Sequence, residues 1–571
     1  METVEPIITA PDGAEYSLEQ NECSGAYEFT LKVVSERELS LSGLSISFSI
    51  KSGDIAGRWY PHYTDRGMGV TWRSPYQSSF NSGAPVVAFY APDDRNRLTA
   101  ALSDGTNEWS FRTGANEVTG RLEFRATLGS LIAKSYSVKF LVDLSPRPYY
   151  DSIKAVADWW GEVVGSPYIP KSAYDPVYST WYVFHHDVYD ELLIKHSEMA
   201  ARLGFRTLFI DAGWSVPDDS PGATHAGDWK PYPEKFPDMK SFVERIHSLG
   251  MKVVLWAAPG IAGYKSRAAK RYEGMTLGRI DGINAFSLDP RYPVIRANVC
   301  RDLCTLVRST GIDGLKLDFI DCVNGSDCAI DEKRDFASVK DAMKCLLSDL
   351  TNKLRALDPE FLIEYRQSYT SPDILKSGNI VRSADCPQDQ QSNRQNIIDL
   401  RLQTNSAVHA DMVQFMPDEE AEISALQITN ILFSVPQISV DLEKLSDRQT
   451  KMLGFYIGFM SEKRKLLTGS HIAPHRCEAN FTCVEAENEA EKLAVLYAER
   501  LYTLTSPEKT QYIVNSAFRN GIIIGSEKPE EYEITLLDCT GEIVRKETRR
   551  LCGYERLDVP LCGMAIVISM R

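Results

Sequence analysis

Residues 311–321, GIDGLKLDFID, decide the fold. In this stretch Lys316 and Asp318 alternate with apolar residues, and this period of two predicts a β-strand that carries both side chains on one face. A lysine and a carboxylate at the C-terminal end of a buried strand are typical of the catalytic end of a (β/α)8 barrel. The alternative interpretation is an ion pair between the two side chains that only stabilises the barrel.

The surrounding chain, from about residue 175 to 465, alternates between predicted strands and predicted helices. Such alternation implies a parallel sheet. About eight strand–helix units over roughly 290 residues match the usual size of a (β/α)8 barrel. The predicted strands are 179–184, 206–214, 252–260, 311–321, 361–366, 379–385 and 436–442, and the predicted helices are 189–205, 238–251, 291–310, 335–357 and 391–405.

The two ends of the chain have a different sequence pattern, in which short runs of alternating apolar and polar residues are separated by Gly, Asp and Asn turns. Runs of this kind predict antiparallel strands. We therefore expect a multidomain protein of α/β and β class, in which a central (β/α)8 TIM barrel is flanked by two β-domains. The expected parts are an N-terminal β-sandwich (1–150), a linker and helix (151–174), the catalytic barrel (175–470) and a small C-terminal antiparallel β-sandwich (471–571).

Composition excludes several classes of partner. The net charge of the 571 residues is −15 and no basic block occurs, which argues against nucleic acid or an anionic membrane surface. No apolar run reaches 18 residues and no signal peptide is visible, so we expect a cytoplasmic protein, with a removed export signal as the alternative. The twelve cysteines form no C-x-x-C pair, which argues against a zinc ribbon.

Polar and aromatic side chains recur where the predicted barrel strands end. Carboxylates can accept hydrogen bonds from hydroxyl groups and tryptophans can stack on sugar rings, so this set predicts a neutral, hydroxyl-rich substrate. The candidates are Trp181, His185, Asp211, Trp214, Trp256, Lys316, Asp318, Arg366, Arg382, Asp385 and Asp389.

Glycoside cleavage needs two carboxyl groups across the scissile bond, about 5–5.5 Å apart in retaining enzymes. Asp318 and Asp385 end the fourth and sixth predicted strands, at the same mouth of the barrel. Lys316 would keep Asp318 ionised. Asp385 would need a drier or more negative setting to keep its proton near neutral pH. Asp389 is either a second candidate acid or a carboxylate at a helix N-terminus.

Several motifs resemble glycoside hydrolase family 36 and the related family 27, the α-galactosidases. GLKLDFID resembles their K-x-D strand, and RSADCPQDQ (382–390) resembles the segment of the acid/base. LGFRTLFIDAGW (203–214) and residues 227–256 resemble further family motifs. The resemblance implies a retaining exo-acting α-glycosidase without cofactor, with Asp318 as nucleophile and Asp385 as acid/base. It also implies that Asp211, Lys316 and Trp256 bind sugar hydroxyls.

Three departures from the family pattern concern the sugar site. Ala212 replaces the second acid of D-D-G-W, WAAPG (256–260) replaces W-x-E-P-E, and EYRQSYTSPD (364–373) replaces a Cys- and Gly-rich stretch. They leave open a family member specific for another sugar, a transglycosylase, or a non-catalytic carbohydrate-binding barrel. Arg366 could then meet an anionic substituent. The substrate is expected to be an oligosaccharide or glycoside, and the sequence leaves homo-oligomer formation open.

Overall fold

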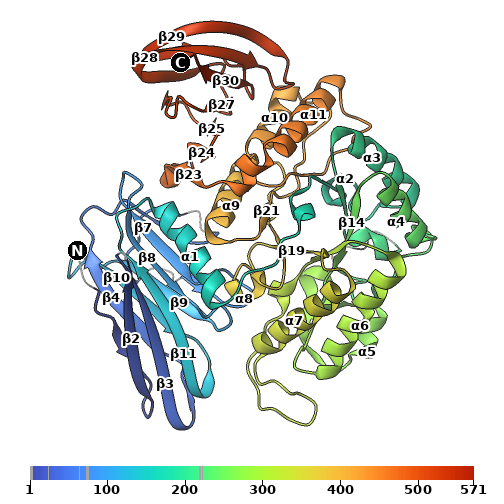
Figure 1. Cartoon of the computed structure of the whole chain (residues 1–571). Helices are drawn as coiled ribbons and strands as arrows, with labels where there is room; N and C mark the ends of the chain where they lie inside the picture. The colour runs from blue at the N-terminus through green and yellow to red at the C-terminus, as the bar shows by residue number, and fades with distance from the viewer. Residues whose placement is uncertain are drawn as a thin grey trace.

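The computed structural model describes residues 4–23, 25–62, 65–72, 76–217, 220 and 223–570. The chain forms three parts in sequence order, as Figure 1 shows: β-sheets at the N-terminus, a central part rich in helices, and a sheet at the C-terminus. The helix α1 (Tyr149–Val163) and the short helix η1 (Lys171–Tyr174) connect the first part to the second.

The N-terminal part consists of a five-stranded and a six-stranded sheet that share one hydrophobic core. Within it, Phe48 stacks on Phe124 (4.7 Å between ring centroids) and Phe29 stacks on Phe140 (4.6 Å). The first sheet contains β1 (Ile7–Thr9), β4 (Ser45–Lys51), β10 (Arg121–Leu128), β9 (Trp109–Ala115) and β6 (Tyr76–Ser78). The second contains β2 (Glu15–Cys23), β3 (Ala26–Ser40), β11 (Ile132–Asp143), β8 (Asn96–Leu102), β7 (Val86–Tyr90) and β5 (Gly57–Trp59).

The central part is built on a barrel-like sheet of eight parallel strands. Its order is β22 (Gln437–Ile438), β12 (Val177–Ser179), β13 (Thr207–Ile210), β14 (Lys252–Ala257), β18 (Gly314–Leu317), β19 (Leu362–Arg366), β20 (Ile380–Arg382) and β21 (Ala407–His409). Parallel bridges between His409 and Val435 and between Val413 and Ile438 connect the two ends of this order. The carboxyl ends of all eight strands therefore face the same way.

At least one helix follows each strand of this sheet. They are α2 (Trp181–Phe184), α3 (Asp190–Leu203), α4 (Met239–Ser248), α5 (Arg267–Arg271), α6 (Pro293–Thr310), α7 (Val339–Leu357), α8 (Pro372–Leu375), α9 (Gln390–Gln403), α10 (Ala421–Thr429) and α11 (Asp447–Glu462).

Local signals explain where several of these helices begin and end. Helices α3 and α6 end at Gly204 and Gly311, whose positive φ angles (101° and 75°) are the left-handed conformation that glycine adopts without steric cost. Pro293 opens α6, where its missing N–H costs no hydrogen bond. A capping box between Ser446 and Gln449 opens α11.

Two predictions about the central part need correction. Residues 179–184 are not one strand: β12 ends at Ser179, and Trp181 to Phe184 form the helix α2. A small antiparallel sheet, which the sequence did not predict, lies between β14 and α6 and contains β15 (Ile261–Gly263), β17 (Ala285–Leu288) and β16 (Thr276–Ile280). The strand predicted over 311–321 is also too long, because β18 ends at Leu317 and Ile320 to Cys322 form a short helix. Both strand predictions were too long because apolar runs of three to six residues do not distinguish a strand from a helical turn.

The C-terminal part is one sheet and not the purely antiparallel domain that was expected. Most neighbours are antiparallel, but β25 pairs with β27 and β26 pairs with β28 in parallel. Its strands are β23 (Ile472–His475), β24 (Cys483–Glu487), β25 (Glu491–Leu496), β26 (Leu501–Thr503), β27 (Thr510–Asn515), β28 (Ile522–Leu537), β29 (Ile543–Leu557) and β30 (Met564–Ser569). The alternating pattern predicted the strands, but it carries no information on the direction of pairing.

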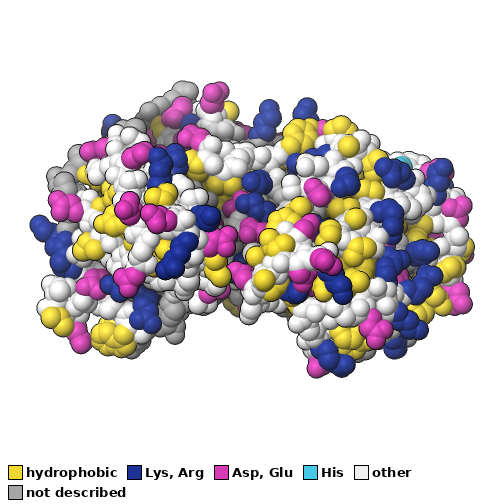
Figure 2. Space-filling view, turned by 90° about the horizontal axis from the view of Figure 1, so that it is seen from below, with side chains coloured by type: hydrophobic (Ala, Val, Ile, Leu, Met, Phe, Trp, Pro, Cys, Tyr) yellow, Lys and Arg dark blue, Asp and Glu magenta, His cyan; other side chains and the backbone are white. Residues whose placement is uncertain are grey.

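Figure 2 shows one face of the molecule, on which Lys and Arg side chains lie among Asp, Glu and hydrophobic side chains and are more frequent on the right-hand side. Within the described part of the chain, no helix combines the length and the apolar character needed to cross a bilayer.

Candidate active site

A buried ion pair lies at the carboxyl ends of β13 and β18. Lys316 Nζ is 2.6 Å from Asp211 Oδ2, and both side chains are 7% exposed. Burial lowers the pKa of Lys316, but Asp211 and more distant carboxylates outweigh it, so the pKa is above its usual value. Asp211 Oδ1 also accepts a hydrogen bond from its neighbour Ala212 N (2.9 Å). Asp211 and Lys316 are thus two fixed opposite charges beneath the mouth of the sheet.

Asp318 lies directly after β18 and is surrounded by hydrogen-bond donors. Its Oδ1 accepts bonds from Arg366 Nε (2.7 Å), Phe319 N (2.8 Å) and Tyr369 OH (3.3 Å), while its Oδ2 accepts one bond, from Trp256 Nε1 (3.0 Å). Burial raises the pKa of this carboxyl, but Arg366, Lys316 and these bonds outweigh it, so the pKa lies below its usual value. Asp318 is therefore held ionised, with one oxygen less occupied than the other.

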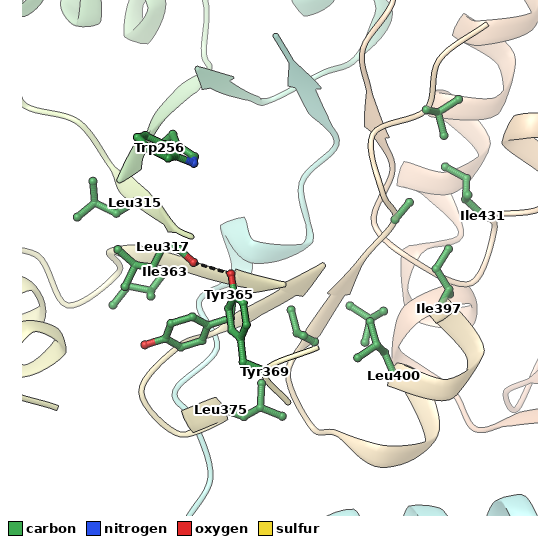
Figure 3. Close-up of a cluster of buried hydrophobic side chains, with 14 of the residues drawn as sticks. Trp256, Leu315, Leu317, Ile363, Tyr365, Tyr369, Leu375, Ile397, Leu400 and Ile431 are labelled. Carbon is green, nitrogen blue, oxygen red and sulfur yellow. Dashed lines mark hydrogen bonds between the residues drawn. The ribbon is translucent and has the colours of Figure 1, made fainter. Parts of the chain in front are cut away.

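The two residues that most restrict Asp318 come from β19 and the loop after it. Figure 3 shows Tyr369 beneath the end of β18, where its hydroxyl also donates to Leu317 O (3.1 Å). The guanidinium of Arg366 lies 5.4 Å above the Tyr369 ring. Arg366 Nη1 donates to Gln367 O (3.0 Å), and Nη2 lies 3.6 Å from Asp321 Oδ1. The guanidinium of Arg366 is therefore already engaged with this chain's own carboxylates.

Asp385 follows β20 and pairs with Arg382. Arg382 Nη2 donates to Asp385 Oδ1 (2.9 Å), and its Nη1 donates to the buried carboxylate of Asp411. The side chain of Asp385 is 54% exposed. Burial raises its pKa, but Arg382, Lys316 and Arg366 outweigh it, so the pKa lies below the usual value. The drier, more negative setting that the acid role needs is thus not present in the unliganded site.

Asp321 has the opposite tendency. Burial, opposed by Arg366 and reinforced by Asp318, raises its pKa. Its Oδ1 is buried and receives no hydrogen bond from the described residues. The electrostatic influence of both Asp318 and Asp385 on this group places three carboxylates in one neighbourhood. Asp321 stands at the end of the predicted strand 311–321 and belongs to the polar residues at the predicted strand ends, but the sequence assigned it no role of its own.

A second polar layer lies deeper in the barrel-like sheet. Glu364 is 1% exposed, accepts a bond from Gln437 Nε2 (2.6 Å) and lies 3.6 Å from Arg382 Nε. Burial raises its pKa to about 7, against the influence of Arg382 and Lys316. Glu364 therefore lies near members of both ion pairs of the site: Arg382, which pairs with Asp385, and Lys316, which pairs with Asp211.

The tryptophans separate into two groups. Trp256 contacts Asp318 through its Nε1, and its ring lies 6.4 Å from that of Trp229. Trp214 is fully buried and donates to Trp256 O (3.0 Å). This hydrogen bond holds the backbone of Trp256. Because Trp214 is fully buried, the prediction that it contacts sugar does not agree with the structure.

Three further candidates lie at the margin of the site. Trp181 is half-buried on α2, and the exposed His185 follows this helix with its ring 5.0 Å from that of Trp181. Asp389 caps α9, where it accepts bonds from Ser392 N (3.0 Å) and Ser392 Oγ (2.6 Å). Of the two roles predicted for Asp389, the structure contains the helix cap.

The positions that depart from the family motifs are closed. Ala258 is fully buried, and Ala212 is 6% exposed. A Cβ at Gly260 would approach Val323 Cγ2 to 2.3 Å, so no acidic side chain could stand there without displacement of Val323. An acid at position 260 would therefore need a rearrangement of Val323.

No group of three or more His, Cys, Asp or Glu side chains with the arrangement of a metal site occurs among the described residues. The sequence reasoning missed Tyr369, Asp411 and Gln367, which organise the site. The sequence gives little indication of these residues, because each stands in a loop or after a strand of three to five residues. In such segments no hydrophobic periodicity shows which side chains point into the site.

Comparisons with known proteins show similarity in sequence and in fold. A family model described as melibiase matches residues 164–368. The α-galactosidase Mel36A of Lactobacillus acidophilus is 26% identical over 222 residues, which are 35% of this chain and 30% of that protein. The A type blood α-D-galactosamine galactosaminidase of Flavonifractor plautii is 31% identical over 143 residues, 24% of this chain and 12% of that protein. The matched regions thus span less than a third of these relatives.

Solved structures extend the likeness to the whole fold. The GH36 α-galactosidase AgaA of Geobacillus stearothermophilus superposes with a TM-score of 0.69 at 14% identity, over 98% of this chain and 81% of that one. A variant of AgaA in complex with stachyose gives 0.70 at 13% identity, with the same coverage. The family model and the relatives support a GH36 α-galactosidase-like glycoside hydrolase family for the region that they match, and the solved structures show the same fold.

Proposed function

We propose that this chain is a retaining exo-acting α-glycosidase that hydrolyses terminal α-linked sugars, with α-galactosides as the first substrates to test. The observation that carries the proposal is Asp318: an ionised carboxylate at the mouth of a barrel-like sheet, held by Arg366, Trp256 and Tyr369. We also propose that the sheet is a closed (β/α)8 barrel, residues 175–470, between β-domains of residues 1–150 and 471–571.

In the first step, Asp318 attacks the anomeric carbon and the glycosidic C–O bond breaks. Oδ2 is the attacking atom, because Oδ1 already accepts three hydrogen bonds and Oδ2 only one. Asp385 donates its proton to the leaving oxygen. The products are a glycosyl ester on Asp318 and a free alcohol, as in double displacement.

In the second step, Asp385 takes a proton from water, and the water oxygen attacks the anomeric carbon and releases Asp318. The pKa of Asp385 is lowered in the unliganded site. A bound sugar would cover its exposed side chain, and the loss of water favours the neutral acid. Attack by a sugar hydroxyl in place of water would give transglycosylation through the same ester.

Asp321 is the competing acid, since its pKa is raised and it lies near both other carboxylates. Azide distinguishes the two. Without the acid/base, water is not activated and the glycosyl ester on Asp318 accumulates. Azide attacks this ester without the help of a base, so it restores turnover and gives a glycosyl azide as product. We expect this rescue for Asp385→Ala and its absence for Asp321→Ala.

Sugar specificity is the finer part of the proposal. Galactose is the sugar of the named α-galactosidase relatives, and one relative is named for galactosamine. The loss of acids at Ala212 and Gly260 favours a sugar other than unmodified galactose. Oligosaccharides such as stachyose and raffinose, which are bound in AgaA variants, are candidate partners.

The test is hydrolysis of a panel of aryl α-glycosides, including galactoside, galactosaminide and uronosyl members, by wild type and Asp318→Ala. We expect wild type to cleave at least one member with retention, as read by NMR of the first product, and the variant to be inactive. A melting-temperature increase with sugars that are bound but never cleaved would instead indicate a carbohydrate-binding barrel.

A further inference from the structure

The N-terminal part of the chain reaches into the loops that carry the candidate catalytic groups. The buried amide of Asn81 donates to Ile320 O (3.2 Å) and Val323 O (3.1 Å), in the loop after Asp318. Gly83 N donates to Ser368 O (2.7 Å), in the loop after Arg366. These bonds connect residues more than 200 positions apart in the sequence, so they are formed only by the docking of the two parts.

His62 extends this contact to the loop after β20, which contains Asp385. Gln367 is 1% exposed, and its side-chain amide hydrogen-bonds His62 Nδ1 on one side. On the other side, Gln367 Oε1 accepts a bond from Ala384 N (2.9 Å), the residue before Asp385. Gln367 N also donates to Arg382 O (2.9 Å). A continuous path of hydrogen bonds therefore runs from the N-terminal part to the backbone at Asp385.

The protonation of His62 is consistent with this path. Burial and the neighbouring Arg66 lower its pKa to about 3, so the ring is neutral near pH 7. A neutral ring can accept the amide proton of Gln367 at Nδ1 only if Nε2 carries the hydrogen. That nitrogen lies 2.9 Å from Thr370 Oγ1, which can accept it. Donors and acceptors thus match along the whole path.

We propose that His62 and Gln367 are positioning residues, through which the N-terminal part fixes the backbone at Asp385 for proton transfer to the leaving group. This inference rests on the proposed function of Asp385 as acid/base. Asp385 needs such support because its side chain is 54% exposed and it pairs with Arg382, which favours the ionised form. A proton donor must lie within hydrogen-bond distance of the leaving oxygen, so a small displacement of the loop weakens catalysis.

The test exploits the leaving group. A dinitrophenyl group departs without protonation, whereas a methyl or sugar leaving group requires the acid. We expect Gln367→Ala and His62→Ala to lose roughly 10- to 100-fold in kcat/KM with the poor leaving group, which is a part of the roughly 10²- to 10⁴-fold that general acid catalysis contributes. With the dinitrophenyl glycoside of the same sugar the loss should be less than about threefold.

Two further variants serve as controls. His62→Asn keeps an acceptor near the position of Nδ1 and should recover most of the activity with the poor leaving group. Thr106→Val removes a bond from Thr106 Oγ1 to Asp373 Oδ2 (3.0 Å), which also joins the N-terminal part to the central part but lies off the path. It should change both substrates equally.

The outcomes distinguish a failure of the positioning role from a failure of the proposed function. If Asp385→Ala depends steeply on the leaving group but Gln367→Ala affects both substrates equally, the positioning role is wrong and the proposed acid stands. If Asp385→Ala shows no such dependence, or if wild type cleaves neither glycoside, the proposed function fails and the inference fails with it. Equal activity of Gln367→Ala and wild type on both substrates would also overturn the inference.

Discussion

Removal of the positive charge beside the candidate nucleophile should change the pH dependence of hydrolysis. In the variant Arg366→Met, Asp318 loses the bond that Arg366 Nε donates to its Oδ1 at 2.7 Å. Arg366 favours the ionised carboxylate, so its removal raises the pKa of Asp318. The acidic limb of the kcat/KM profile should therefore move to higher pH, because protonated Asp318 cannot attack.

The size of this shift follows from the strength of the lost contact. A hydrogen bond to a charged group contributes about 1.5–3 kcal/mol, and one pKa unit corresponds to about 1.36 kcal/mol. The acidic limb should move by roughly one to two units. Lys316 and the bond from Trp256 Nε1 remain, so part of the lowering of the pKa is retained.

The assay is kcat/KM measured from about pH 2 to pH 8, since this ratio reports the groups of the free enzyme and the lowered pKa of Asp318 places the acidic limb of wild type at the low end of this range. Arg366→Lys is the matched control: it keeps a charge near Asp318 and should shift the limb by less. An acidic limb at the same pH in Arg366→Met and wild type would refute the assignment. The same variants test the earlier hypothesis of an anionic substituent, because a loss confined to uronosyl substrates would show that Arg366 also contacts substrate.

Three further predictions concern the core, the domain contact and the sugar site. The pKa of Glu364 is raised from 4.5 to about 7 by burial, so it contributes stability that is complete below pH 4.5 and is lost as the pH rises through about 7. Urea unfolding should show a fall of about 3 kcal/mol over this range that is absent in Glu364→Gln, and an equal fall in both proteins would contradict it. Asp399→Ala breaks the buried ion pair with Arg66 (2.7 Å, side chains 3% and 1% exposed) that joins α9 to the N-terminal part. It should cost about 3–5 kcal/mol of unfolding free energy, whereas Asp158→Ala, at the exposed pair with Lys154, should cost less than about 1 kcal/mol. Ala212→Asp restores an acid beside Asp211 and should raise the preference for α-galactoside over other α-glycosides by about tenfold, or about 1.4 kcal/mol; an unchanged ratio of kcat/KM values would show that position 212 does not set specificity.

The candidate catalytic residues could be predicted because they stand in motifs that are local in sequence. The period of two predicted Lys316 and Asp318 on one side of the chain, and a lysine beside a carboxylate at a strand end is informative wherever the rest of the chain lies. The alternation of strands and helices predicted the parallel sheet, and Gly204 predicted the end of α3. Hydrophobic period and cap residues act within a few positions, so a sequence contains them in full.

Only the tertiary structure decided how the site is arranged. The pairing of Asp385 with Arg382, the engagement of Arg366 with Asp318, and the burial of Trp214 depend on packing between distant strands. The path from His62 to Ala384 joins residues 322 positions apart by way of Gln367. Charge and burial in three dimensions shift the pKa values, so the sequence predicted Asp318 and Asp385 as candidates, and the fold determined the direction in which the pKa of each is shifted.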